Sequence, residues 1–330
     1  MEAGLGNFPL NTAMFIRPER LVPSGWTGHV PFGSWLIAAA EPKLFVELGS
    51  HFGMSYAAFC QTVEEHGLST KCYAVDTWQG DEHAGFYGDD VFQDLNQFNE
   101  KHFAGFSRLM RMTFDEAATY FADGTVDLLH IDGLHTYEAV KYDFETWREK
   151  LSDRAIVLFH DTAVRERGFG VWQFWAEISK EFPHIEFDNS AGLGVLFVGK
   201  NQPQTVQELL NFAADEHQLR DMKGMFSVLG ESVLRRWELD VTRKEKIEGI
   251  KQLQDQLAAK EALLSKATDD VGATSAVIKQ VTQDNETLKQ KLQQTNESLR
   301  QSQETVSQLS NSVSYRVTKP LRLFRRVFAR

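Results

Sequence analysis

Short apolar segments alternate with longer amphipathic ones over residues 31–200 of the chain. This alternation predicts parallel strands connected by helices, because a strand that is buried on both faces reads as a continuous apolar run. The expected strands are 44–48, 72–75, 108–112, 126–131 and 155–159, and the expected helices are 32–40, 55–66, 91–101, 115–121, 137–150 and 171–182. Segments 185–187 and 195–198 are expected to close the sheet as an antiparallel pair. The predicted fold is therefore α/β, with a doubly wound sheet and an antiparallel closing strand.

From residue 250 onward, apolar residues instead recur with a period of seven. The first heptad positions are Ile250, Leu257, Leu264, Val271, Ile278, Asn285, Leu292, Leu299, Val306 and Val313. The fourth positions are weaker, with Leu253, Val281, Leu288 and Leu309 beside polar Lys260, Thr274, Thr295 and Ser302. This pattern predicts a long α-helical coiled coil, in which a single Asn at a first position favours a parallel dimer and a trimer is the alternative. As one rod it would extend about 90–100 Å. A lone solvated helix or a disordered linker is the other interpretation.

Composition divides the chain in the same way. Of 330 residues, 42% are hydrophobic and the net charge is −11, but nearly all Trp and Gly precede about residue 240. We expect an N-terminal extension over 1–30, a globular domain over 31–200, a helical connector over 201–246, the coiled coil over 247–313 and a tail over 314–330. Cys60 and Cys72 have neither disulfide nor metal-knuckle spacing, and the chain does not begin with a basic-then-apolar leader, so a cytoplasmic location is expected.

The C-terminal tail has its own signal, because residues 315–330 carry six cations and no acid. After Pro320, Leu321, Phe324 and Phe328 fall on one helical face that arginines flank. This composition predicts an interfacial helix that binds an anionic membrane surface, here the inner face of the plasma membrane. Nucleic-acid binding is the alternative, which the acidic body of the chain and the apolar tail residues disfavour. No stretch approaches the length of a membrane span.

The first chemical signal is the glycine-spaced turn after strand 44–48. Gly49 can take the positive φ of a tight turn, and Gly53 lets the next helix start close to the strand. Backbone N–H groups around Ser50 and the helix N-terminus then face a ligand. Position 51 is His rather than Gly, which departs from the dinucleotide fingerprint and weighs against NAD.

Carboxylates stand at the ends of two successive strands, Glu47 in the first and Asp76 in the second. The second position accepts both ribose hydroxyls of a nucleoside in doubly wound folds. Together with the turn, the pair suggests S-adenosylmethionine (SAM) as the cofactor. Glu47, Gly49, Ser50, Gly53, Asp76 and the following Thr77 are the expected cofactor-binding residues.

A second cluster follows strands 126–131 and 155–159, which both end in His and Asp. Neighbouring parallel strands would bring these ends together. Asp132, Asp161 and His160 are candidate ligands for Mg²⁺ or Mn²⁺. The cation would hold two substrate oxygens, and His135 would accept a proton from the acceptor hydroxyl. The plainer interpretation is that each Asp caps a helix and that the loop His is solvated.

Other polar and aromatic residues are assigned to packing or to the acceptor. His130 lies inside a strand and is expected to be a core histidine with a satisfied hydrogen bond. Asp143 is expected to face solvent or to brace the loop. Trp172 and Trp175 are expected in the core of an amphipathic helix, whereas Trp78 is the candidate for stacking on a sugar.

These motifs resemble a known family. The segment from about Trp26 to Gly199 is similar to class I SAM-dependent methyltransferases of the methyltransferase-24 type, which have a Rossmann-like sheet. The similar parts are Phe45-Val-Glu-Leu-Gly, Tyr73-Ala-Val-Asp-Thr-Trp-Gln-Gly-Asp, Leu129-His-Ile-Asp-Gly-Leu-His-Thr-Tyr, Phe159-His-Asp-Thr and Gly192-Leu-Gly-Val. The resemblance covers about half of the chain.

In metal-dependent sugar O-methyltransferases of this type, an Asp matching Asp132 and an acidic pair matching His160 and Asp161 bind magnesium. A His matching His135 is the base. The resemblance also implies cofactor contacts at Glu47, Gly49 and Asp76 and, around the adenine, at Thr113 and Phe114. His160 replaces an acid, which favours a softer divalent ion or a water in that position.

The resemblance implies an O-methyltransferase that acts on a sugar hydroxyl of a bacterial surface polysaccharide, O-antigen-like, or of a lipid-linked glycan. The basic tail resembles, more loosely, segments of bacterial polysaccharide-assembly proteins, so glycosyltransferases are among the expected partners. The alternatives are a non-catalytic coiled-coil scaffold of such an assembly and a methyltransferase for a small molecule or nucleotide sugar.

Overall fold

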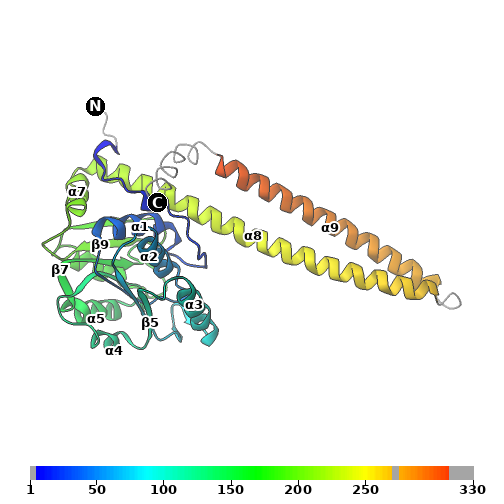
Figure 1. The fold of residues 1–330 in the computed structure, drawn as a ribbon, viewed down its shortest axis with the longest axis horizontal. Coiled ribbons are helices and arrows are strands. Elements are labelled where there is room, and N and C mark those ends of the chain that lie inside the picture. Colours follow the sequence, from blue (N-terminus) through cyan, green and yellow to red (C-terminus); the bar gives the residue numbers. More distant parts are fainter. Residues whose placement is uncertain (1–4, 270–274, 312–330) are drawn as a thin grey trace. The chain divides into compact units, whose positions relative to one another are not determined.

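The computed structural model describes residues 5–269 and 275–311. The chain forms two compact units, residues 1–234 and 235–330. The first unit contains a seven-stranded sheet in the order β5-β2-β1-β6-β7-β9-β8 (Figure 1). Its strands are β1 (Leu44–Leu48), β2 (Lys71–Asp76), β5 (Ser107–Arg111), β6 (Val126–Ile131), β7 (Leu151–His160), β8 (His184–Phe187) and β9 (Leu193–Phe197). β1, β2, β5, β6 and β7 pair in parallel, while β9 runs antiparallel to both β7 and β8, so the doubly wound prediction is confirmed.

Helices cover both faces of this sheet because its central strands are apolar on both sides. Phe45 of β1 packs into one apolar cluster and the next residue, Val46, into the other. The first cluster includes residues of α1 (Val30–Ala40), α2 (Met54–Glu65) and α3 (Asp89–His102), and the second includes residues of α4 (Phe114–Ala118), α5 (Tyr137–Arg148) and α6 (Val171–Ile178). Every helix expected over residues 31–200 is therefore present, with ends that differ by a few residues.

The polar loop expected between β2 and α3 contains a small antiparallel pair, β3 (Gly80–Asp81) and β4 (Gly85–Phe86). We call residues 80–87 the flap. Asp81 shapes its turn, because its Oδ1 accepts hydrogen bonds from the N–H groups of His83 and Ala84, both at 2.7 Å. The flap adds a structured segment beside the carboxyl ends of the parallel strands, where α/β sheets bind ligands.

Residues 201–234, expected to be a connector, belong to the first unit. α7 (Gln204–Ala213) buries Phe212, and the first turns of α8 (Glu216–Asp269) bury Met222 and Phe226. Phe226 packs edge-on against Phe32 of α1, with ring centroids 5.2 Å apart. This segment thus completes the core on the α1 face of the sheet.

The second unit is a helical hairpin made by α8 from residue 235 onward and α9 (Ser275–Ser310). Lys246 Nζ donates to the Ser302 hydroxyl at 2.9 Å and to the Ser298 carbonyl at 3.2 Å. Lys260 Nζ pairs with Asp284 Oδ2 at 3.0 Å. Lys246, the earlier residue of α8, pairs with the later residue of α9, and Lys260 pairs with the earlier one. The two helices are therefore antiparallel.

The predicted heptad face is the contact face of this hairpin. Val281 and Asn285 are buried, with 6% and 4% exposed surface, and the other first and fourth positions with described burial are half-buried, except that Val306 and Leu309 near the end of α9 are exposed. In this structure the helix opposite the face belongs to the same chain, and Lys260, a polar fourth position, meets Asp284 there. A parallel dimer would instead place two Lys260 side chains opposite one another. Association with a second chain stays a prediction.

None of the described helices is both long and apolar enough to cross a membrane. The predicted basic tail at 314–330 and the heptad positions Val271, Thr274 and Val313 lie outside the described residues.

Candidate active site

The turn after β1 forms the floor of a cavity of about 410 Å³. Gly49 has φ +86° and its N–H donates to the Val75 carbonyl at 2.9 Å, which ties β1 to β2. Gly53, at φ +76°, is the N-cap of α2. Gly49, Ser50, Gly53, Asp76, Thr77, Thr113 and Phe114 all line the cavity. These seven predicted cofactor residues are therefore brought together.

Asp76 braces the glycine turn as well as lining the cavity. Its Oδ2 accepts hydrogen bonds from the N–H groups of Ser50 and His51, both at 2.9 Å, and its Oδ1 accepts from Trp78 N at 2.7 Å. A carboxylate that accepts three backbone N–H bonds is fixed in direction. Asp76 thus lines the cavity and also holds the glycine turn in place.

Glu47 is the one predicted cofactor residue that does not line this cavity. Its side chain is fully buried, and its carboxylate accepts hydrogen bonds from Ser50 Oγ at 2.7 Å and pairs with His130 Nδ1 at 2.9 Å. Alternation along β1 explains the position, since Glu47 points to the same face as Phe45. His130 is the core histidine that the sequence predicted, with this one ring nitrogen bonded.

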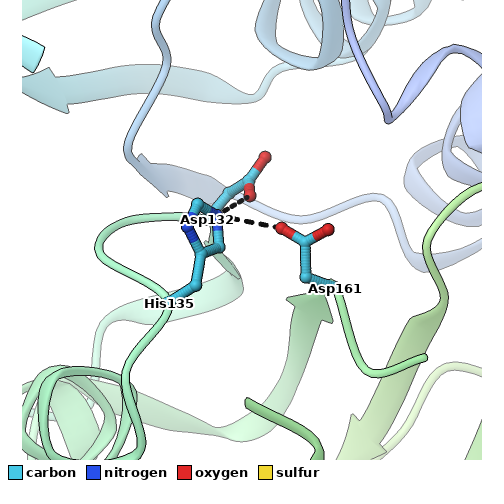
Figure 2. Close-up of side chains that lie close together, drawn as sticks. All are labelled: Asp132, His135 and Asp161. Atoms are coloured by element: carbon cyan, nitrogen blue, oxygen red, sulfur yellow. Dashed lines mark ion pairs between the residues drawn. The ribbon is translucent and has the colours of Figure 1, made fainter. Parts of the chain in front are cut away.

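Carboxylates and imidazoles converge at the ends of β6 and β7 (Figure 2). His135 Nε2 lies 2.9 Å from Asp161 Oδ2 and 3.5 Å from Asp132 Oδ1. One donor atom from each of these three residues lies within 4.8 Å of the others. Around a cation with bonds of about 2.1 Å, adjacent octahedral ligands are about 3.0 Å apart, and two carboxylates with one imidazole are a candidate donor set for a divalent ion such as Mn²⁺.

His160 also contacts both carboxylates, with Nδ1 at 3.1 Å from Asp132 Oδ1 and 3.3 Å from Asp161 Oδ2. Its ring lies beneath the N-terminal segment, because a Cβ added to Gly25 would stand 3.3 Å from His160 Cε1. Both histidines are therefore candidates for the nitrogen ligand, since each has a ring nitrogen within 3.5 Å of the same two carboxylate oxygens.

Mutual charge sets the proton affinities in this cluster. Burial would raise the pKa of Asp161, but the neighbouring His160 charge and hydrogen bonds from both histidines lower it to about 2. Burial would lower the pKa of His135, but its hydrogen bonds to Asp132 and Asp161 raise it to about 9. His135 is thus protonated at neutral pH, and it becomes a proton acceptor only when the carboxylate charges are neutralised by another cation.

Asp143 was expected to face solvent or to brace the loop, and the first of these is wrong. It is buried in α5 with 8% exposed surface, and a Cβ added to Gly133 would lie 3.4 Å from its Oδ2. Burial and, next, the charge of Asp115 raise the pKa of Asp143 to about 7. The inward direction follows from helical periodicity, because Asp143 shares the α5 face of the buried Val140 and Trp147.

Asp143→Asn is expected to make the fold more stable at alkaline pH. The pKa of the Asp143 carboxyl is near 3.8 in the unfolded chain and about 7 in the folded chain. Between these two pH values, unfolding releases a proton that the buried carboxyl retains. The free energy of unfolding therefore falls by about 4 kcal/mol as the pH rises through this range. Asparagine removes this loss. In urea unfolding, the variant should match the wild type near pH 4 and exceed it by about 2–4 kcal/mol at pH 8. A constant difference at both pH values would contradict the assignment.

Trp78, predicted to stack on a sugar, is instead a core residue with 1% exposed surface. Its indole N–H donates to the His51 carbonyl at 3.0 Å, and its ring packs on Phe92 with centroids 4.9 Å apart. The polar loop around it gave no sign of its direction. Trp175 is buried as predicted, while Trp172 is half-buried beneath the Arg165 guanidinium, 4.7 Å from its ring centroid.

The structure adds residues that no sequence motif assigned to the cofactor or the cation. The cavity is also lined by Pro23, Ser24, Gly25, Asp81, Ala84, Tyr87 and Leu134. The first three come from the N-terminal segment and Asp81, Ala84 and Tyr87 from the flap. Tyr87 was detectable as an aromatic in the polar loop, but residues 23–25 carry no motif, since only their packing over the sheet edge brings them to the cavity.

Comparison with known proteins places this site in context. Residues 46–162 match the family model described as a methyltransferase domain. Uncharacterized protein y4gI of Sinorhizobium fredii (strain NBRC 101917 / NGR234) is 48% identical over 229 residues, which cover 69% of this chain and 25% of that protein. The chain thus spans about a quarter of the length of this curated relative.

Solved structures with similar folds include methyltransferases. The O-methyltransferase TomG from Streptomyces achromogenes, involved in tomaymycin synthesis and solved in complex with SAM, is 14% identical over 57% of this chain and 87% of that chain, with a TM-score of 0.41. The SAH-bound methyltransferase PaMTH1 from Podospora anserina is 14% identical over 51% of this chain and 77% of that chain, with a TM-score of 0.39. The family match covers the glycine turn, Asp76 and the Asp132, His135 and Asp161 group. Residues 46–162 of this chain are therefore similar to the methyltransferase domain family.

Proposed function

We propose that this chain is a SAM-dependent O-methyltransferase that uses a divalent cation. The observation that carries the proposal is a single cavity lined both by the braced glycine turn and by the Asp132, His135 and Asp161 group. A nucleoside bound at Asp76 and a hydroxyl bound at the cluster would share this cavity. In-line methyl transfer requires this proximity.

The residues of the chain have separate roles in the proposed reaction. Asp76 accepts the ribose hydroxyls, and the amides at the N-terminus of α2 face the cofactor. Asp132, Asp161 and one of the two histidines hold the cation. When bound, SAM supplies the methyl group and the cation supplies positive charge that lowers the pKa of the acceptor hydroxyl. His135 Nε2 takes up the hydroxyl proton if His160 is the nitrogen ligand.

The proposed acceptor is a sugar hydroxyl of a surface polysaccharide or lipid-linked glycan. Support comes from the mixture of groups at the flap, where the half-buried Tyr87 ring stacks on His51 at 4.6 Å beside Asp81. Aromatic faces next to carboxylates suit sugars, which are apolar on their ring faces and polar at their edges.

The test of the cofactor site is calorimetric titration of the full chain with SAM, with and without Mg²⁺ or Mn²⁺. Wild type should bind saturably, and Asp76→Asn should bind at least about tenfold more weakly because its amide lacks the charge that orients both hydroxyls. Asp123→Asn, an exposed acid paired with Lys150, is the matched control. Absence of wild-type binding under every metal condition would favour the scaffold alternative.

We further propose that residues 314–330 bind anionic membranes from the cytoplasmic side. Each of the six cations of this tail contributes about 1 kcal/mol of attraction to an anionic membrane when it is near the surface. Removal of the tail should abolish this attraction. A chain truncated after Val313 should stop sedimenting with phosphatidylserine liposomes, whereas the full chain should sediment at low salt. Equal sedimentation of both chains would show that the tail is not the anchor.

A further inference from the structure

The loop at residues 164–170, which follows β7, packs directly on His135. The ring of Phe169 lies 4.5 Å from the His135 ring at 11°, so the two are stacked. Phe169 also stacks on His83 of the flap, at 4.6 Å and 19°. The two histidine rings are 5.5 Å apart at 29°, and one aromatic side chain therefore contacts both.

Hydrogen bonds fix Phe169 in this position. The carbonyl of Phe169 accepts from Trp172 Nε1 at 3.1 Å, and the next residue, Gly170, donates its N–H to the His135 carbonyl at 2.7 Å. Arg167 Nη2 donates to the His83 carbonyl at 2.5 Å, and its guanidinium lies 5.5 Å from the Phe169 ring centroid. The loop is thus tied to the backbone of both histidine-bearing segments.

His135 needs such support because its second ring nitrogen is not held by a hydrogen bond. Nδ1 is buried and has no hydrogen-bond partner among the described residues, while Nε2 points to Asp161. Imidazoles in metal sites are ordinarily oriented by a hydrogen bond on the nitrogen that does not face the metal. Here a stacked ring is the contact available to set the imidazole plane.

We propose that Phe169 is a positioning residue, which holds the His135 imidazole between Asp132 and Asp161 and joins the flap to the same ring. This inference rests on the proposed function, because it gives the cluster its working geometry. A flat ring is required, since an aliphatic side chain of similar volume fills the space without fixing the plane of its neighbour.

Three variants of the full chain test the proposal. Phe169→Leu keeps apolar volume and removes the ring, whereas Phe169→Tyr keeps the ring. Phe182→Leu is the control, because Phe182 is also half-buried but packs in the cluster around α4 to α6. Mn²⁺ affinity is measured by electron paramagnetic resonance, amide hydrogen exchange is measured over 80–87 and 134–137, and methyl-transfer kinetics are measured with SAM.

Phe169→Leu should lower the Mn²⁺ affinity or kcat about tenfold. Amide hydrogen exchange should become faster in residues 80–87 and 134–137, and the KM for SAM should be unchanged. Phe169→Tyr and Phe182→Leu should behave as wild type. Wild-type Mn²⁺ affinity, kcat and exchange in Phe169→Leu would overturn the proposal, as would equal defects in Phe169→Tyr. If wild type neither binds Mn²⁺ nor transfers methyl groups, the proposed function fails separately. The exchange data then decide whether Phe169 holds these segments.

Discussion

Asp132→Asn is expected to lower the rate of methyl transfer about a thousandfold, because the variant loses the charge around which the cluster is built. Asp132 Oδ1 faces both His135 Nε2 and His160 Nδ1. An amide of the same shape can neither attract the cation nor offset the two imidazoles. Mn²⁺ affinity should fall with the rate, while binding of SAM through Asp76 should persist.

The measurement is initial rate at saturating SAM, with electron paramagnetic resonance for bound Mn²⁺. Asp123→Asn serves as the control again, since it neutralises an exposed carboxylate, 68% accessible, that pairs with Lys150. A rate within about threefold of wild type would contradict a catalytic role for the cluster. A lost rate with unchanged Mn²⁺ affinity would exclude Asp132 as a ligand.

Gly49→Ala is expected to destabilise the first unit by about 3–5 kcal/mol. Gly49 has φ +86°, and an added Cβ would stand 2.1 Å from the Asp132 carbonyl oxygen. Because the clash is with backbone, the loop that carries Asp132 and His135 must move. Gly67→Ala is the matched control, since Gly67 has φ +63° with nothing within 4 Å of an added Cβ. It should cost only about 1 kcal/mol.

Urea unfolding followed by tryptophan fluorescence measures this difference in the first unit, because all Trp residues except Trp237 precede residue 235. SAM binding should also weaken in Gly49→Ala and remain unchanged in Gly67→Ala. Equal loss of stability in the two variants would show that the left-handed backbone, rather than the approach to Asp132, requires glycine at position 49.

The sheet was predictable from the sequence because strands that are buried on both faces appear as short apolar runs, separated by the longer amphipathic pattern of the helices. β6, expected at 126–131, has those limits, and the antiparallel closing pair was placed correctly. The flap was missed because each of its strands has two residues, too few to show a period. Asp81 and Tyr87 were recognisable only as polar and aromatic residues of a loop, not as members of a strand pair beside the cavity.

The candidate site was predictable where strand ends determine it. Asp132 and Asp161 meet because β6 and β7 are neighbouring parallel strands. Side-chain direction was less predictable, and Glu47 and Trp78 both turn into the core. Each has a buried hydrogen-bond partner, His130 for Glu47 and the His51 carbonyl for Trp78, that lies far away along the chain or in an irregular turn.

The heptads predicted a contact face but not the direction of the helix opposite. Both parallel and antiparallel partners use the same first and fourth positions. Contacts such as the one between Lys246 and Ser302 determine whether the opposite helix is parallel or antiparallel. The heptad pattern of the sequence does not reveal these contacts. Asn285 is buried in this face with neither side-chain polar atom hydrogen-bonded among the described residues.

The antiparallel hairpin changes the reach of whatever follows it. A single rod carries its far end away from its start, but here Lys246 lies beside Ser302, so the end of α9 returns toward residues near 240. Lengthening both arms equally would leave that return point unchanged. The last turns of α9 therefore lie beside the first turns of the hairpin, whatever the length of its two arms.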